Sequence, residues 1–111
     1  MANFVGRCLG HESGTISSTA VSLTSIPAAT IVPQNSFLVG ILTVSEPVRS
    51  TLDGSTTPTT TVGYPVQAER DLVEYIIQGR DNLTNLKLIR ISDDAIYNVV
   101  YLAEEYRRGA E

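Results

Sequence analysis

The sequence predicts an all-β domain: a single antiparallel β-sandwich, jelly-roll-like or immunoglobulin-like, with an extended N-terminal arm. Short runs of β-branched and aromatic residues recur along the chain, Gly, Pro, Asn and Asp residues separate them, and no βαβ alternation is present. The chain has 111 residues, enough for one domain with a hydrophobic core and too few for two of ordinary size. We therefore expect an arm over residues 1–18, a sandwich over 19–102 and a polar tail over 103–111.

The N-terminal segment, residues 1–18, carries several glycines, serines and threonines and shows no sustained hydrophobic period. Such a segment is either a floppy terminus or an arm that a neighbouring subunit orders. In the second case its apolar residues Phe4, Val5 and Leu9 pack against that subunit and bury apolar area there.

The first strands are predicted from alternation and from proline breaks. Residues 19–26 alternate between apolar and polar side chains, which indicates a half-buried strand that Pro27 ends. Residues 28–32 are expected to form a second short strand, and residues 33–36 a turn. Residues 37–44 are strongly apolar and predict a buried strand.

Residues 47–63 contain the clearest turn signal in the chain. Asp53 and Gly54 both tolerate positive φ, which a tight hairpin connection demands, and they separate an arm at residues 48–52 from a Thr-rich arm. Arg49 lies four residues before Asp53. It either pairs with Asp53 across the hairpin, which is the favoured interpretation, or reaches a carboxylate of a partner.

The second half of the chain continues the strand pattern. The succession Val-Tyr-Ile-Ile favours a strand over residues 72–78, while the charges at residues 69–71 leave a short helix open just before it. Residues 79–82 predict a turn and residues 86–91 a strand, in which Arg90 is either a solvated edge residue or a contact. After an Asp-Asp turn, the last strand is expected over residues 95–102, with one face formed by Tyr97, Val99 and Tyr101.

Composition excludes several classes of protein. The formal net charge is −4, so no basic field attracts phosphate backbones, and nucleic-acid binding is not expected. No apolar run is long enough to cross a bilayer, and the N-terminus lacks a secretory pattern, so we expect no membrane association and synthesis in the cytoplasm. Charged residues make up only 18% of the chain, which is typical of a domain with a covered, interacting surface.

Residue types that carry chemistry are scarce. The single cysteine and the single histidine, Cys8 and His11, have a ligand-like spacing, but a structural zinc site needs four donors and only Glu12 is nearby. A Cys-His nucleophile pair also needs an orienting third group. The adjacent acidic pairs near the C-terminus are expected to face water. The sequence therefore predicts no catalytic residues, no metal, no cofactor and no enzymatic activity.

Three motifs carry a resemblance to a known family. The stretch PVRSTLDGSTTPTTTVGYPV, followed later by NLTNLKLIRISDDAIYNVVYL, resembles a family of small tailed-phage virion proteins, over residues 21–102. Members carry a Val-Arg-x-x-x-Asp-Gly-x-x-Pro-Thr-x-x-x-Gly element, a Leu-x-x-Phe/Leu-x-x-Ile-Arg segment and a closing strand like Leu-Asn-Val-x-Tyr-Tyr. The matching positions here are Val48, Arg49, Asp53, Gly54, Pro58, Thr59 and Gly63, then Leu86, Ile89 and Arg90, then Tyr97, Asn98, Val99 and Tyr101.

The resemblance implies a β-sandwich structural protein of a phage virion. The specific expectation is a capsid decoration or cement protein, a homo-oligomer that binds the major capsid protein or other virion proteins and stabilises the assembled head. The expected partner-binding residues are Phe4, Val5, Leu9, Arg49 and Arg90. Placement at the collar, tail or fibre is the first alternative. The second is a carbohydrate-binding or adhesion module, because TLDGSTTPT also resembles a turn in small sandwich domains appended to glycan-acting enzymes, although the chain has no Trp.

Overall fold

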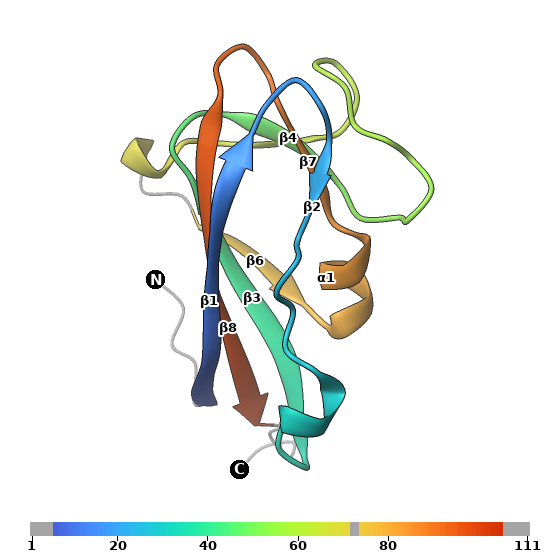
Figure 1. Ribbon diagram of the computed structural model, residues 1–111, viewed down its shortest axis with the longest axis vertical. Helices are drawn as coiled ribbons and strands as arrows, with labels where there is room; N and C mark the ends of the chain where they lie inside the picture. The colour runs from blue at the N-terminus through green and yellow to red at the C-terminus, as the bar shows by residue number, and fades with distance from the viewer. Residues whose placement is uncertain (1–5, 72–73, 106–111) are drawn as a thin grey trace, which may run out of the picture.

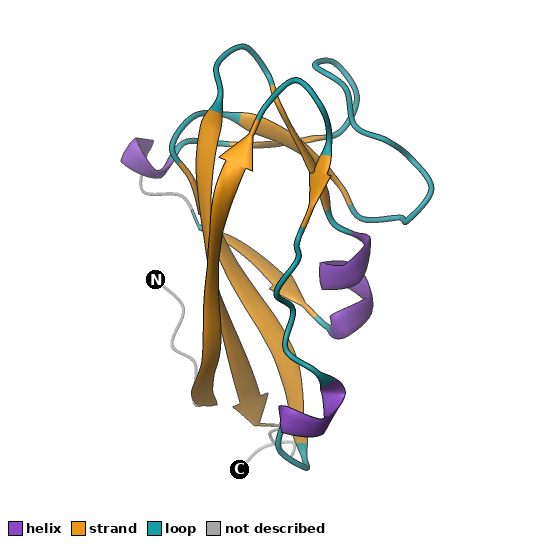
Figure 2. Cartoon of the chain, viewed as in Figure 1, coloured by secondary structure: helices purple, strands orange, loops and turns teal. Residues whose placement is uncertain are grey.

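The computed structural model describes residues 6–71 and 74–105, which form two four-stranded antiparallel sheets (Figures 1 and 2). The first sheet has the strand order β1-β8-β3-β6, with β1 at Gly6–Ile16, β8 at Ala95–Glu105, β3 at Ser36–Val44 and β6 at Tyr75–Gln78. The second has the order β2-β7-β4-β5, with β2 at Val21–Ser22, β7 at Lys87–Arg90, β4 at Val48–Thr51 and β5 at Tyr64–Val66. The predicted all-β sandwich is confirmed.

The long strands β3 and β8 lie in the middle of the first sheet. They pair from Ser36 opposite Glu105 to Val44 opposite Tyr97, and alternate side chains along each strand turn into the core. The predicted face of β8 is confirmed, because its three members are at most 5% exposed. Those members are Tyr97, Val99 and Tyr101.

A short helix, α1 (Arg80–Asn85), closes one side of the core between β6 and β7 (Figure 1). Its Leu83 is fully buried and lies over Gly40 of β3, where an added Cβ would stand 2.6 Å from the Leu83 Cδ2 atom. The prediction of a plain turn at residues 79–82 is therefore wrong. Gly79 turns the chain at φ 96°, and a single buried leucine then holds a helix too short to show a sequence period.

The predicted N-terminal arm is largely a strand of the sandwich, since β1 pairs with β8 from Gly6 opposite Glu104 to Ile16 opposite Ala95. The pattern escapes sequence analysis because the register shifts between Cys8 and Gly10 and because two inward positions are glycines. The sandwich therefore begins well before residue 19. It also extends beyond residue 102, because β8 continues to Glu105, while residues 1–5 and 106–111 lie outside the described part.

Two further predictions need correction. Residues 28–32 do not form a strand, because Ala29–Ile31 makes a 3-10 turn between Pro27 and Pro33. The strand expected over residues 19–26 shrinks to β2. The second half fits better, since Glu69–Asp71 forms a 3-10 turn, β6 follows it, and β7 lies within the strand expected over residues 86–91.

The connection between β4 and β5 is a loop over residues 52–63 rather than a tight hairpin. The two strands do pair antiparallel, with Val48 opposite Val66. Asp53 and Gly54 make a local turn, and the Thr-rich stretch forms a second turn in which Thr59 Oγ1 accepts from the N–H groups of Thr61 and Val62. Threonine hydroxyls therefore bond within the loop instead of lining a strand.

Candidate functional site

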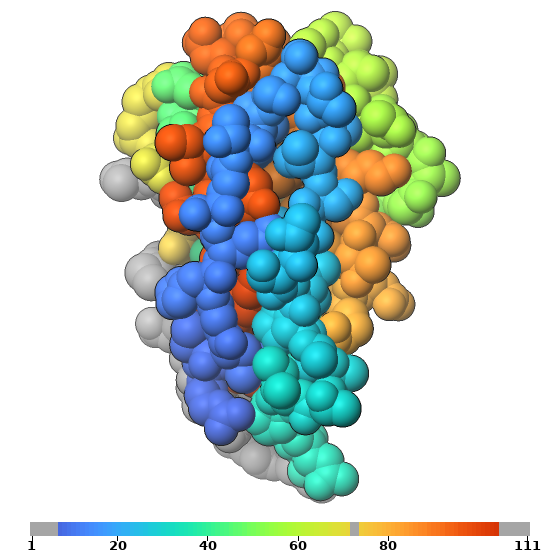
Figure 3. Space-filling model, in the orientation of Figure 1, coloured from blue at the N-terminus to red at the C-terminus, as the bar shows by residue number. Residues whose placement is uncertain are grey.

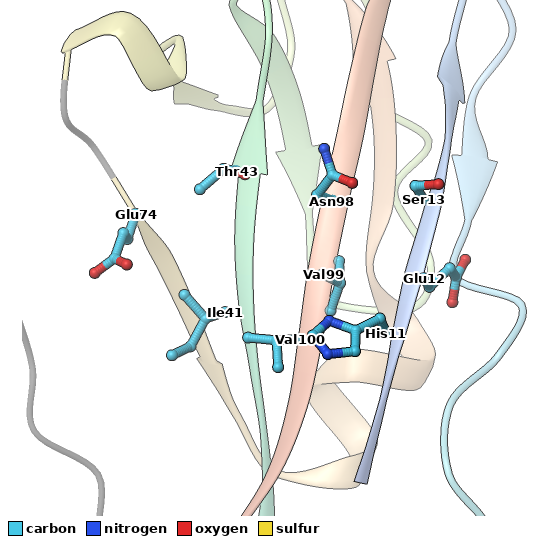
Figure 4. Close-up of a pocket in the computed structure, with 9 residues that line it drawn as sticks. All are labelled: His11, Glu12, Ser13, Ile41, Thr43, Glu74, Asn98, Val99 and Val100. Atoms are coloured by element: carbon cyan, nitrogen blue, oxygen red, sulfur yellow. The ribbon is translucent and has the colours of Figure 1, made fainter. Parts of the chain in front are cut away.

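The outer face of the first sheet carries an open hollow of about 320 Å³ (Figure 4). Side chains from β1, β8 and β3 line it, and Glu74 borders it just before β6. The strand pairing sets their order: His11 lies opposite Val100, and Val100 lies opposite Ile41. A polar row of Ser13, Asn98 and Thr43 runs beside this one.

Aliphatic side chains dominate the middle of this outer face. Because their neighbours along each strand point into the core, they must point outward. We call the set the aliphatic strip, and its members are Val39, Ile41, Ile76, Val100 and Leu102. Val39 is fully buried and the other four are half-buried. An apolar centre with a polar border is the anatomy of a protein contact surface.

The inner side of β1 carries a buried carboxylate, Glu12, which is 7% exposed and points away from the hollow (Figure 4). Its Oε1 accepts from Ser25 N at 2.8 Å and from the Tyr101 hydroxyl at 2.7 Å. Its Oε2 accepts from Thr24 N at 2.9 Å, from Thr24 Oγ1 at 3.2 Å and from the Tyr97 hydroxyl at 2.6 Å. Both carboxylate oxygens are thus fully engaged.

Glu12 ties the first sheet to the segment that follows β2. In Figure 3 this segment (cyan) lies along β1 (blue), and the Glu12 carboxylate is bonded to its backbone at Thr24 and Ser25. Burial by itself raises the pKa of the Glu12 carboxyl, but the hydrogen bonds it accepts act the other way and hold the pKa below its usual 4.5. Burial and the bonds to Glu12 raise the pKa of the Tyr97 and Tyr101 hydroxyls. At neutral pH the Glu12 carboxylate is therefore ionised, and its hydrogen bonds hold β1, β8 and the segment after β2 together.

The sequence pattern does not reveal this cluster. It marks Glu12 only as a donor near Cys8 and His11, and it predicts Tyr97 and Tyr101 on one face of the last strand, which is correct. One feature of the sequence does point to the cluster. Glu12 and Ile16 are four residues apart, so they lie on the same face of a strand, and a carboxylate on a buried face needs hydrogen-bond partners.

Arg49 does not pair with Asp53, so the favoured sequence interpretation is wrong. Its Nε donates to Thr60 O at 3.0 Å and its Nη1 to Gly63 O at 2.9 Å, which fastens the loop over residues 52–63 to β4. Asp53 instead accepts from the Thr56 hydroxyl at 2.6 Å and from two backbone N–H groups. The Thr56 hydroxyl and these N–H groups lower the pKa of Asp53 to about 2.

The structure does not bring the predicted partner-binding residues together. Phe4 and Val5 lie outside the described residues. Leu9 is half-buried against the core, and Arg90 of β7 forms an ion pair with Asp94. These two and Arg49 come from three different strands and do not line the hollow. Their role in partner binding stays a prediction.

Cys8 and His11 are both exposed, and Cys8 Sγ lies 3.6 Å from His11 Nε2. Within residues 6–71 and 74–105, no group of three or more potential metal-binding side chains comes together.

Comparisons with known proteins give no identification: no family model, curated protein or solved structure matches the chain. Among the described residues, no helix has the length and apolar character needed to span a membrane. What the structure establishes is the class, an all-β sandwich of two antiparallel sheets.

Proposed function

We propose that this chain is a structural protein of a tailed-phage virion, a decoration subunit that binds the assembled head through the outer face of its first sheet. The observation that carries the proposal is the aliphatic strip, in which four half-buried side chains surround the fully buried Val39 on adjoining strands of a domain that is otherwise rich in hydroxyl groups. The resemblance of its three sequence motifs to virion proteins supplies the kind of partner.

The physical basis is burial of apolar surface against a rigid platform. The three strands β8, β3 and β6 fix the strip without loops, so docking orders few backbone groups and the entropic cost is small. Polar side chains beside the strip, among them Asn98 and Thr43, can hydrogen-bond at the border of the contact. Edge strands such as β1 offer a second surface for contact between copies.

The test is attachment to phage particles. Purified protein is mixed with heads, tails and complete particles of the phage that encodes it, and bound protein is measured by co-sedimentation. Asn98→Arg places a long charged side chain at an exposed position that lines the hollow, and it should weaken head binding by about tenfold or more, equivalent to about 1.4 kcal/mol. Ser22→Arg introduces the same charged side chain at an exposed position of β2, away from the hollow, and this variant should bind heads normally.

Each outcome decides a separate point. Equal loss for both variants, or none for either, would overturn the assignment of the outer face. Binding to tails, collars or fibres but not to heads would move the subunit to that part of the virion. Failure to bind any particle would overturn the virion role itself.

A second candidate function, glycan binding, is favoured by one observation. Tyr64 of β5 is 65% exposed and stacks on Tyr75 of β6, with ring centroids 5.8 Å apart. Gln67 and Glu74 border a small hollow beside the rings, so an aromatic surface and hydrogen-bonding groups lie together. A glycan array should show saturable binding that Tyr64→Ala removes, and an array without signal eliminates this candidate.

A further inference from the structure

The exposed pair Cys8 and His11 has the geometry of two adjacent ligands of a tetrahedral metal ion. We propose that this pair is half of a zinc-type site, and that a second copy of the chain completes the site with its own Cys8 and His11. The inference rests on the proposed self-association, because one copy supplies only two donors.

A β-bulge creates the pair. In a regular strand, residues three positions apart point to opposite faces, so Cys8 and His11 would be separated by the sheet. The register of β1 against β8 shifts between Cys8 and Gly10, which inserts Leu9 as an extra residue. Leu9 packs against the core while Cys8 and His11 both stay exposed. The bulge therefore places a thiol and an imidazole side by side.

The distance between the two donor atoms fits metal binding. With Zn–S near 2.3 Å, Zn–N near 2.0 Å and tetrahedral angles, two ligands of one zinc ion lie about 3.6 Å apart. Cys8 Sγ and His11 Nε2 are 3.6 Å apart. In the metal-free protein the thiol can donate to the imidazole across the same distance, so a metal ion can replace the shared proton without rearrangement of β1.

The position of the pair lets a second copy approach. β1 is an edge strand of the first sheet, so its outer side is not occupied by another strand of the described chain. Cys8 lies opposite Leu102 and His11 opposite Val100, two residues of the outer face, and both ligands are exposed, so a second copy can reach them from that side. A two-fold axis beside Gly10 sets the pair of one copy against the pair of the other.

Two copies supply the complete ligand set of a structural zinc site, two thiolates and two neutral imidazoles. Binding releases one thiol proton from each copy, and the divalent charge of the metal balances the two thiolates, so the centre is neutral. Within one described chain no third donor joins the pair, so the four-ligand site requires the dimer.

The probe is Co²⁺, added anaerobically to the full-length, metal-free protein with a non-thiol reductant present. We expect the visible absorption of tetrahedral cobalt and a sulfur-to-cobalt charge-transfer band, both saturating at one cobalt per two chains, with doubling of the mass in native mass spectrometry. Zn²⁺ should displace the cobalt, and EDTA should restore the metal-free mass. Cys8→Ser and His11→Ala should each abolish the bands and the doubling, whereas Ser13→Ala, on the same face of β1, should change neither.

Several outcomes would overturn the proposal. Saturation at one cobalt per chain without a change in mass would show a site completed by solvent. Bands that survive in Cys8→Ser or His11→Ala would show metal bound elsewhere, and a dimer that forms only after oxidation would show a disulfide. Head attachment is measured separately. Normal head attachment without cobalt binding rejects the metal site alone. Cobalt binding without head attachment rejects only the virion role.

Discussion

Glu12 links β1, β8 and the segment after β2 in the interior of the sandwich. Two tyrosine hydroxyls, two backbone N–H groups and one threonine hydroxyl donate to it, and they come from β8 and from the segment after β2. Hydrogen bonds to a charged group contribute about 1.5–3 kcal/mol each to stability, and an unpaired buried donor is costly. We therefore expect Glu12→Gln to lower the free energy of unfolding by about 2 kcal/mol or more at neutral pH.

The pH dependence of stability gives a sharper prediction for Glu12. Its folded-state pKa lies below 4.5, so its contribution is complete above that pH and is lost as the pH falls through the folded value. The difference in unfolding free energy between wild type and Glu12→Gln should therefore shrink toward low pH, measured by urea unfolding from pH 7 downward. Glu74→Gln, at an exposed position, is the matched control. A difference that stays constant with pH would contradict this role of the carboxylate.

Two glycines of β1 allow a matched test at the scale of the element. An added Cβ at Gly14 would lie 2.7 Å from Cε2 of the Tyr97 ring, whereas one at Gly10 would meet nothing within 4 Å. Gly14→Ala should displace Tyr97 from Glu12 and cost about 1–3 kcal/mol, while Gly10→Ala should be close to neutral. Urea midpoints of the two variants check this. Equal effects would mean that β1 does not pack on β8 as described.

Deletions separate the roles of the N-terminal residues. Removing residues 1–18 takes away β1, including the buried Ile16 and the Glu12 carboxylate, so we expect this variant not to fold. Removing only residues 1–5 leaves β1 intact and should preserve the thermal transition. The second deletion tests whether Phe4 and Val5 contribute to attachment: weaker head binding with an unchanged transition supports the predicted contact, and unchanged binding rejects it.

The sequence predicts elements where local pattern and tertiary environment agree. A continuous apolar run marks β3, and a face of Tyr97, Val99 and Tyr101 marks β8, because each strand buries one full face in the core. It fails for β1, where a bulge and Gly14 interrupt the pattern, and for α1, which depends on Leu83 alone. The aliphatic strip could not be predicted from the sequence for a different reason. It exists only once β8, β3 and β6 lie side by side, and no local sequence pattern gives the order of the strands.

The whole molecule carries a net charge of −4, and this charge opposes any contact between copies. If an apolar face or an uncharged metal centre holds the copies together, salt should strengthen their association, because screening weakens the repulsion and leaves apolar burial intact. Between about 0.01 M and about 1 M salt the screening length falls from about 30 Å to about 3 Å, which spans the separation of surface charges on neighbouring copies.

Sedimentation velocity across this range of salt, with and without Zn²⁺, measures the effect. We expect the dimer fraction to rise with salt in both series and to be larger with Zn²⁺ at every salt concentration. Cys8→Ser should remove the difference between the series without changing the response to salt. A dimer fraction that falls as salt rises would show that opposite charges hold the copies together, and it would exclude the metal centre as the main contact between copies.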